Sequence, residues 1–596
     1  MNATRDVFGN MPHLQWLDLS HNYIKEFDFD GFKNTKNLQV LYLSHNRLVD
    51  LPPDLFRPVR YLRIIDLQHN HLRSLPDNLF YNGGLEKIDL SHNNLLKIPA
   101  SSMSSLAALS MCELRMSHNF IATIHGMDLS NKFRSLRFLD VSNNHLLRID
   151  DAVFATLPKL AILDLSHNRD LKVMEKSFMG LENTLLKLGL ENVSLSTVPE
   201  MKLKMLREIR LRYNELPSIP QDMATNMSNI RVLDISYNDL TNVPLMTQML
   251  TRLEKLILSG NPITSLNNNS FEGVNENLEM LDISNLRLHY FEYGSLESLP
   301  NLRSLKITAY SHLRHFNIPD LLRHHHNIRE LWIEAPEMRE RRDDSSSSSS
   351  SSSSSAERTS SGNPSISTKD KQKERERVPM GTPTDLEREL KGYLPSKLTN
   401  ITFSGPQFTT LGEKILKGLR TPYIYIHLYN TSLAGFPANF FKFMGRVRNI
   451  SIDIRYNNPL MKQIPNPNTG MVPYLPHSVF LTDLKMWGAD LNCDCNVGWI
   501  EFWQRKRRQY VCSSQTWTDT IFRSFMNAPC QIYGRYNCYE EDDDLRETQC
   551  SNKGSKSLME VIKSDLECGW DSATSLHVPT MTIFVGIFLT TVALIM

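Results

Sequence analysis

The sequence predicts an α/β-type solenoid, in which short parallel strands line the concave face of a horseshoe and a disulfide-rich cap closes the carboxy-terminal end. Two observations lead to this fold class. A leucine-spaced unit recurs every 21 to 26 residues, and seven of the eight cysteines crowd into the last fifth of the 596-residue chain. Since the chain is several times longer than a typical domain, an array is favoured over one compact core.

The repeat unit begins with Leu14, Leu17 and Leu19, followed by Asn22. Its alternation points two leucines to the same side of a short strand, and stacked units cover one another's apolar edges. This spacing is typical of leucine-rich repeats. Fourteen copies start at Leu14, Leu38, Leu62, Leu85, Met111, Leu136, Leu160, Leu185, Leu206, Ile230, Leu253, Leu278, Leu302 and Ile328, and weaker copies at Leu398, Tyr423, Val447 and Leu481.

Two further columns of residues recur with the repeat and are predicted to stabilise it. Asparagine amides satisfy backbone groups where the chain leaves each strand, and phenylalanines stack as a core spine. The asparagine column fails at Val193, Leu286 and Tyr310, where irregular coils are expected. Its members are Asn22, Asn46, Asn70, Asn93, Asn119, Asn144, Asn168, Asn214, Asn238 and Asn261, and the spine is Phe8, Phe32, Phe56, Phe80, Phe154, Phe178 and Phe271.

Histidines and aspartates also align along the array. The histidines are interpreted as turn-edge residues, with a shared metal ion or a pH-sensitive stripe as alternatives. The aspartates fall on the solvent side of the strands and are the candidate concave-face residues, although a merely solvated face is the simpler interpretation. The two columns are His21, His45, His69, His92, His118 and His167, and Asp18, Asp66, Asp89, Asp140, Asp164, Asp234 and Asp282.

Composition divides the chain into five segments. Residues 1–336 hold about fourteen repeats, 337–390 a serine- and charge-rich insert, 391–492 about four irregular repeats, 493–570 the cysteine-rich cap, and 571–596 an apolar tail. The insert contains unbroken serine from Ser345 to Ser355. Its polar composition cannot offset the entropy of ordering, so we predict that the insert is disordered.

The cap is expected to be held by disulfides in an oxidising compartment. Cys493-x-Cys495 and the aromatic stretch after it resemble the carboxy-terminal cap of extracellular leucine-rich-repeat proteins. Seven cysteines exceed the four usual in that cap, so their pairing stays open. Zinc is the alternative, but no Cys-x-x-Cys pair is present. The cap cysteines are Cys493, Cys495, Cys512, Cys530, Cys538, Cys550 and Cys568.

Glycosylation sequons favour the same compartment. Each is an asparagine followed, one residue later, by serine or threonine, with no intervening proline. They are Asn2, Asn192, Asn226, Asn268, Asn400, Asn430 and Asn449.

The tail predicts a glycosylphosphatidylinositol anchor. Ser572 and the two small residues after it precede a short spacer and then an apolar run from Ile583 to Met596, which is the order of an attachment signal. We therefore expect lipid attachment at Ser572; a membrane-spanning helix is the alternative. The chain starts inside a repeat without an apolar leader, so we expect that amino-terminal sequence, including the signal peptide, is missing from it.

Charge and motifs argue against other functions. The 66 basic and 65 acidic side chains give a net charge of +1, which provides no electrostatic basis for nucleic-acid binding. The sequence contains no phosphate-binding glycine loop, no His-Glu-x-x-His and no Gly-x-Ser-x-Gly motif. We therefore expect neither an enzyme nor a cofactor, and no resident metal.

Together, the Leu-Asp-Leu-Ser-His-Asn repeats (for example residues 17–22), the cysteine-rich end and the anchor signal resemble a family of extracellular leucine-rich-repeat cell-adhesion proteins of insect photoreceptors. The resemblance implies homophilic adhesion at the outer face of the plasma membrane, and a role in organising photoreceptor membrane. Its partners would be a second copy or another cell-surface protein. The alternative is the ligand-binding ectodomain of a Toll-like or other leucine-rich-repeat receptor.

Overall fold

The fold is described from a computed structural model of the chain, which divides into two compact units, Met1–Leu398 and Thr399–Met596. Each unit is described by itself. The described residues are 2–3, 11–80, 84–104, 110–129, 133–274, 277–310, 312–313, 315–335, 390–437, 440–444, 446–455, 464, 480–487, 489–494, 497–500, 503 and 548–564.

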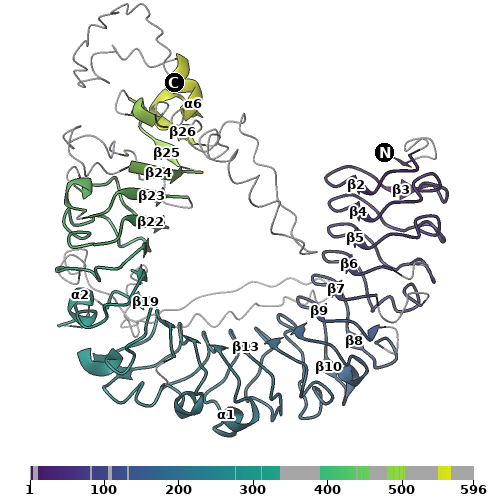
Figure 1. The fold of residues 1–596 in the computed structure, drawn as a ribbon, viewed down its shortest axis with the longest axis horizontal. Helices are drawn as coiled ribbons and strands as arrows, with labels where there is room; N and C mark the ends of the chain where they lie inside the picture. Colours follow the sequence, from purple (N-terminus) through teal and green to yellow (C-terminus); the bar gives the residue numbers. More distant parts are fainter. Residues whose placement is uncertain are drawn as a thin grey trace, which may run out of the picture. The chain divides into compact units, whose positions relative to one another are not determined.

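The first unit is a parallel ladder with one strand for each predicted repeat. Its strands pair in register with the neighbouring coils and line the inner side of a curved path (Figure 1). They are β2 (Trp16–Asp18), β4 (Val40–Tyr42), β5 (Ile64–Asp66), β6 (Lys87–Asp89), β7 (Glu113–Arg115), β9 (Phe138–Asp140), β11 (Ile162–Asp164), β12 (Lys187–Gly189), β13 (Glu208–Arg210), β14 (Val232–Asp234), β15 (Lys255–Ile257), β17 (Met280–Ile283), β19 (Ser304–Thr308) and β20 (Glu330–Glu334).

The far side of each coil carries short elements and little helix. Pro319 lies in the first turn of α2, whose N-cap Asn317 accepts a hydrogen bond from the Asp320 amide. The helical turns are η2 (Val153–Thr156), α1 (Asp222–Asn226), η3 (Leu245–Met249), η4 (Tyr293–Leu296) and α2 (Ile318–Leu321). The paired two-residue strands are β1 (Asn2–Ala3) with β3 (Glu26–Phe27), β8 (Thr123–Ile124) with β10 (Arg148–Ile149), and β16 (Ser265–Leu266) with β18 (Tyr290–Phe291).

The core of the first unit consists of the repeat leucines and the predicted phenylalanine spine. Phe32, Phe56 and Phe80 are buried, with successive ring centroids 5.8 Å apart. Phe154, Phe178 and Phe271 are buried as well. This confirms the spine as packing rather than a ligand-binding row; Phe8 lies outside the described residues.

The asparagine ladder is formed as predicted. The buried Asn238 amide donates to the Leu211 carbonyl of the preceding coil (2.9 Å) and to the Ile235 carbonyl of its own coil (3.0 Å). Its oxygen accepts the Leu216 amide at 3.2 Å. Each ladder asparagine from Asn46 to Asn261 thus joins two coils and pairs backbone groups that burial would otherwise leave unsatisfied. Among the described residues, exposed Asn22 bonds only carbonyls of its own coil.

At Tyr310, where an irregular coil was expected, a phenol replaces the amide. The Tyr310 hydroxyl donates to the Ile283 carbonyl at 3.0 Å and accepts the Leu286 amide at 3.2 Å, so it serves both the donor and the acceptor role. The ring is fully buried, which raises the pKa of Tyr310 far above its ordinary value. At Val193 the neighbouring Asn214 oxygen accepts the Val193 amide.

The second unit continues the same architecture with longer strands. They are β21 (Asn400–Ser404), β22 (Tyr423–Tyr429), β23 (Asn449–Asp453) and β24 (Phe480–Lys485), all parallel, with the turn η5 (Phe440–Phe443) on the connecting side. The register shifts between Ile450 and Ser451 where β23 meets β24. These strands match the four weaker repeats.

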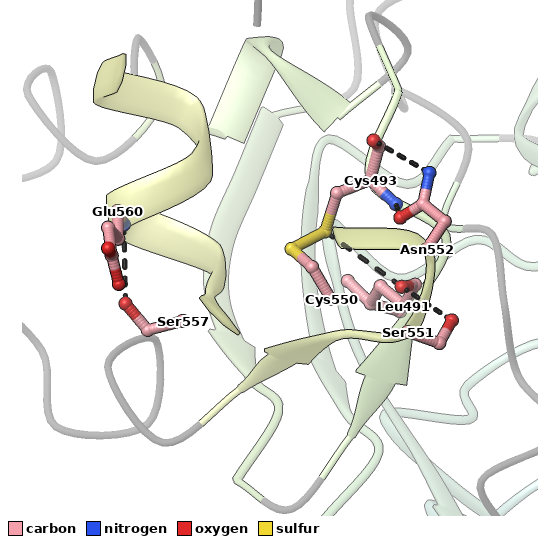
Figure 2. Close-up of a disulfide and its surroundings, with 7 residues drawn as sticks. All are labelled: Leu491, Cys493, Cys550, Ser551, Asn552, Ser557 and Glu560. Carbon is pink, nitrogen blue, oxygen red and sulfur yellow. Dashed lines mark hydrogen bonds between the residues drawn. A yellow bond between two sulfur atoms is a disulfide. The ribbon is translucent and has the colours of Figure 1, made fainter. Parts of the chain in front are cut away.

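A small mixed sheet follows the last repeat strand. It comprises β25 (Asp490–Leu491), β26 (Gln549–Cys550) and β27 (Lys556–Ser557), with η7 (Ser551–Lys553) and α6 (Leu558–Ser564). Cys493 and Cys550 form a disulfide, and the Asn552 side chain bonds both the amide and the carbonyl of Cys493 (Figure 2). Buried Trp503 donates its indole N–H to the Leu481 carbonyl at 2.7 Å, which ties the cap to β24.

Several predictions concern residues outside this description. They are the insert except for its last residue, the anchor site Ser572 with the tail, and the cysteines Cys495, Cys512, Cys530, Cys538 and Cys568.

Candidate functional site

The candidate binding surface is the exposed sheet face of the first unit, meaning the side chains at the first and third positions of its strands. In β2 these are Trp16 and Asp18, which flank half-buried Leu17. Because strand side chains alternate and the coils are in register, each position forms a column along the array.

The predicted aspartates lie in the third-position column, but one oxygen of each is already used locally. Asp140 accepts both the amide (2.9 Å) and the hydroxyl (2.7 Å) of Ser142, and Asp66 accepts the Gln68 amide at 3.0 Å. Burial raises the pKa of Asp89, Asp140 and Asp234. Asp18 is exposed, Asp66, Asp89, Asp140 and Asp164 are half-buried, and Asp234 and Asp282 are buried.

Arg210 is the centre of an ion-pair cluster on this face. Its guanidinium lies 3.1 Å from Asp164, 3.1 Å from Glu191 and 3.6 Å from Glu208. Burial disfavours its charged form, but the three carboxylates outweigh that effect and raise the pKa of Arg210. The arginine reaches Asp164, two coils away, because β12 between them places Gly189 at this position.

Aromatic and arginine side chains, with one isoleucine, form a second feature, here called the aromatic–arginine patch: Trp16, Tyr42, Ile64, Arg115 and Phe138. Trp16 is 54% exposed and packs edge-to-face on Tyr42 at 5.9 Å. The Arg115 guanidinium lies 5.0 Å from the centroid of the Phe138 ring. Tryptophan, tyrosine and arginine are the side chains that most often dominate protein–protein binding energy.

The predicted histidine column lies at the edge of this face, in the turn after each strand. His21, His45, His69, His92 and His118 have φ between 52° and 54° and donate their amides to the following coil, as in the 3.0 Å bond from His45 to Gln68. Four of their rings stack on the next ring at centroid distances of 3.9 to 4.2 Å. This geometry agrees with the turn-edge interpretation, since histidine is, with asparagine and aspartate, one of the non-glycine residues enriched in left-handed backbone.

Three imidazoles of the column, those of His69, His92 and His118, have a lowered pKa. Burial, and then the neighbouring imidazoles, lower the pKa of His69 and His92, while nearby aspartates act in the opposite direction. The pKa of His118 is lowered mainly by burial. Imidazole lone pairs lie in the ring plane, so parallel rings direct them side by side and not toward one point. Among the described residues no three His, Cys, Asp or Glu side chains are grouped as metal ligands.

Beyond His118 the turn-edge column contains other residue types as well as histidine. His167 bonds to Asn192 through Nδ1 at 3.2 Å. Tyr213 and Tyr237 follow, with ring centroids 4.6 Å apart, and the Arg212 guanidinium lies 4.5 and 4.9 Å from their centroids. A left-handed turn position is therefore filled by imidazole, amide or phenol along most of the first unit.

In the second unit the corresponding face is aromatic. The Tyr425 hydroxyl donates to Asp453 at 2.6 Å, and the Arg455 guanidinium holds the same carboxylate at 2.7 and 3.0 Å. Burial would raise the pKa of Asp453, but the bonds from Arg455 and Tyr425 outweigh it and lower that pKa. His427 lies between Tyr425 and Tyr429 on the same strand.

The predicted glycosylation asparagines lie on several parts of the coils. Asn400 and Asn449 begin strands β21 and β23. Asn192 and Asn430 occupy left-handed turns with φ of 51°. Asn268 is exposed, Asn226 ends α1, and Asn2 lies in β1.

Residues that the sequence analysis missed include Arg115, Arg210, Tyr213, Tyr237 and Tyr425. Arg115 and Arg210 occupy the position of the aspartate column, and Tyr213 and Tyr237 that of the histidine column. Tyr425 lies in a weaker repeat, at a strand position for which no column was identified. A count of every residue type at each position, instead of the commonest one, would have revealed them.

A match to a known protein family agrees with this architecture. The leucine rich repeat family matches residues 3–48, 60–121, 134–192, 204–263 and 251–309. Among solved structures, a leucine-rich-repeat protein of Leptospira interrogans has a TM-score of 0.47 and 19% identity, covering 75% of this chain and 92% of that one. The Drosophila Toll–Spatzle complex has a TM-score of 0.41 at 17% identity, covering 80% of this chain and 57% of that one.

Two insect relatives are much more similar in sequence. Chaoptin of Drosophila melanogaster is 72% identical over 573 residues, which are 96% of this chain and 42% of that protein. Chaoptin of Tribolium castaneum is 43% identical over 516 residues, 86% of this chain and 60% of that protein. The chain thus spans less than two thirds of both relatives. With its repeats, its parallel ladder and these identities, the chain belongs to the chaoptin-like family of leucine-rich-repeat proteins.

Proposed function

We propose that this chain is a cell-surface adhesion module whose aromatic–arginine patch binds a second copy of the same chain. The observation that carries the proposal is the patch itself, in which exposed Trp16 and Arg115 lie beside half-buried Tyr42 and Phe138 on β2 to β9. Trp16 is 54% exposed, although the opposite face of the sheet packs into the core of the unit. Exposed groups of this kind are typical of binding surfaces.

Charge supports homophilic contact at this face. A two-fold contact places the same patch against itself, so a surface of one sign would repel its copy. Here Lys87 and Arg115 both pair with Glu113, at 2.9 and 2.8 Å, beside the aspartate column. Charges of both signs therefore lie in and beside the patch, so that ion pairs between two copies can form across the contact.

We also propose that the protein is held at the outer leaflet by a lipid attached at Ser572. The order of small residues, spacer and apolar run supports this proposal. None of the helices in the described part of the chain is long and apolar enough to cross a bilayer. A repeat scaffold without a catalytic motif favours binding over an enzymatic role.

Adhesion is tested by displaying the chain on non-adherent cells. We expect the cells to aggregate, and Trp16→Ala with Arg115→Ala to abolish aggregation at equal surface display. Tyr61→Ala is the matched control, because Tyr61 is 63% exposed but lies outside the strands. Labelled displaying cells are then mixed with unlabelled non-displaying cells. Mixed aggregates would exclude homophily and favour a different surface partner, as expected for a receptor ectodomain.

The anchor is tested on intact cells with phosphatidylinositol-specific phospholipase. Release of the protein into the medium is the expected result. Retention, together with a mature terminus that still contains Ile583 to Met596, would instead establish a spanning helix.

A further inference from the structure

An aromatic row runs along one face of β22. Ile424, Ile426 and Leu428 point into the core and are fully buried. The alternate residues form what is here called the tyrosine row: Tyr423, Tyr425, His427 and Tyr429. Tyr423 and Tyr429 are 37% and 42% exposed, and His427 lies 6.3 and 6.1 Å from the rings on either side. The two ends of the row are exposed and its middle is half-buried, so the rings offer faces on which another group can pack.

The central ring of the row is held in place. The Tyr425 hydroxyl is anchored on Asp453, which is 1% exposed and is itself held by Arg455. A ring fixed at its polar end presents its face with little loss of conformational entropy when something packs on it. The Tyr425 ring is therefore pre-ordered and can serve as a platform on which another group packs.

Two predicted glycosylation asparagines flank this platform. The strand register pairs Asn400 of β21 with Tyr425, and Asn449 of β23 with Tyr423. Their neighbours Ile401 and Ile450 are fully buried, so both asparagines lie on the same face as the row. Neighbouring strands are about 4.8 Å apart, which is within the reach of the first sugar of an attached glycan.

We propose that the N-linked glycans on Asn400 and Asn449 fold back onto the tyrosine row, with the innermost N-acetylglucosamine of each packed on Tyr425 and Tyr423. A pyranose has a face of C–H groups that packs against an aromatic ring, while its hydroxyls stay in water. Cross-strand neighbours thus provide both the attachment site and the platform. The proposal rests on passage through the secretory route that the proposed function requires.

The chain's own glycans fit this face better than a second copy does. Any copy that docked here would bring two more glycans onto the same surface, and N-glycans are bulky and hydrated. The sugars therefore close the sheet face of the second unit to protein partners. Adhesive contact is then left to faces without such a pair of sequons, such as the aromatic–arginine patch.

The experiment uses the chain secreted from insect cells and follows native deglycosylation by peptide N-glycosidase F, with glycopeptide mass spectrometry at each site. The glycan on exposed Asn268 is the internal reference. We expect release from Asn400 and Asn449 about fivefold slower than from Asn268, which corresponds to about 1 kcal/mol of ring contact. Tyr425→Ala should remove the protection at Asn400, whereas Tyr425→Phe, which keeps the ring, should preserve it.

A second measurement does not depend on a variant at the row. Asn400→Gln with Asn449→Gln should increase nitration of Tyr423 by tetranitromethane relative to Tyr61, and Asn268→Gln should not. Equal release rates at all three sites, or unchanged nitration, would overturn the inference. So would empty Asn400 and Asn449 beside an occupied Asn268. A secreted chain without glycan at any sequon would overturn the glycan inference alone, whereas failure to enter the secretory route would overturn the proposed function as well.

Discussion

Arg210 and Asp164 form an ion pair at 3.1 Å although a complete coil separates their strands. The pair exists because Gly189, in the strand between them, has no side chain. A Cβ there would overlap the Asp164 carboxylate and come within 2.8 Å of the Ser166 hydroxyl. One missing side chain on β12 therefore connects charges across three coils of the sheet face.

Gly189→Ala is predicted to break this connection. The added methyl displaces Asp164, and overpacking of this kind costs about 1–3 kcal/mol in the free energy of unfolding. Gly84→Ala is the control, since nothing lies within 4 Å of the Cβ position there. Hydrogen exchange of β11 and β12 and urea unfolding report the effect. A loss no larger than that of the control would mean that the cluster tolerates a side chain at residue 189.

Tyr310→Phe is predicted to destabilise the last coils of the first unit. The change keeps the buried ring but leaves the Leu286 amide and the Ile283 carbonyl without their shared partner. An unsatisfied buried polar group costs about 1–3 kcal/mol. Tyr290→Phe, at an exposed tyrosine, serves as the comparison and should change the unfolding midpoint little. Equal midpoints for both variants would show that the phenol does not replace the ladder asparagine.

The histidine stack is predicted to make the first coils less stable in mild acid. The pKa of His69 and of His92 is lowered in the folded state, so the unfolded chain binds more protons as the pH falls through about 6.5. Stability is therefore complete above that pH and declines below it. Aspartates with raised pKa values have the opposite effect, but in a more acidic range.

This pH dependence is measured by hydrogen exchange of β4 to β7 at about pH 7.5 and about pH 5.5, where histidine titrates. His69→Asn with His92→Asn should weaken it, because asparagine tolerates left-handed backbone and does not titrate. His71→Asn is the control. His71 follows His69 by two residues and lies outside the histidine column, so this change should leave the pH dependence intact. A wild-type chain with equal protection at both pH values would refute the prediction.

Loss of the Cys493–Cys550 disulfide is predicted to destabilise the second unit by about 4 kcal/mol, the chain-entropy value for a loop of this size. The two cysteines are 57 residues apart and both are buried. Cys493→Ser with Cys550→Ser should lower the unfolding midpoint of β21 to β24. Cys112→Ser, at a cysteine of the first unit that forms no disulfide, is the matched control. An unaffected midpoint would assign the stability of the cap to packing, for example of Trp503.

The sequence by itself determined the repeat, its strands and its internal ladders. Leucine alternation is local, so Leu17 and Leu19 predict a strand whatever surrounds them, and Asn238 predicts the turn that follows its own strand. Anchor, adhesion and glycosylation were also predicted from sequence and remain predictions. Local spacing is enough to predict the repeat, its strands and its ladders because each coil repeats the same short-range geometry.

Which side chains of different coils are in contact depends on the tertiary structure and does not follow from local sequence. Tyr310 replaces an asparagine, Arg210 reaches past Gly189, and Asn400 lies beside Tyr425. The tertiary structure also selected Cys493 and Cys550 from the many possible pairings. Because coil lengths vary from 21 to 26 residues, the distance along the chain does not set which residues become neighbours. The register of the stacked strands sets it, since residues one coil apart in sequence are brought within about 4.8 Å only when the strands pair.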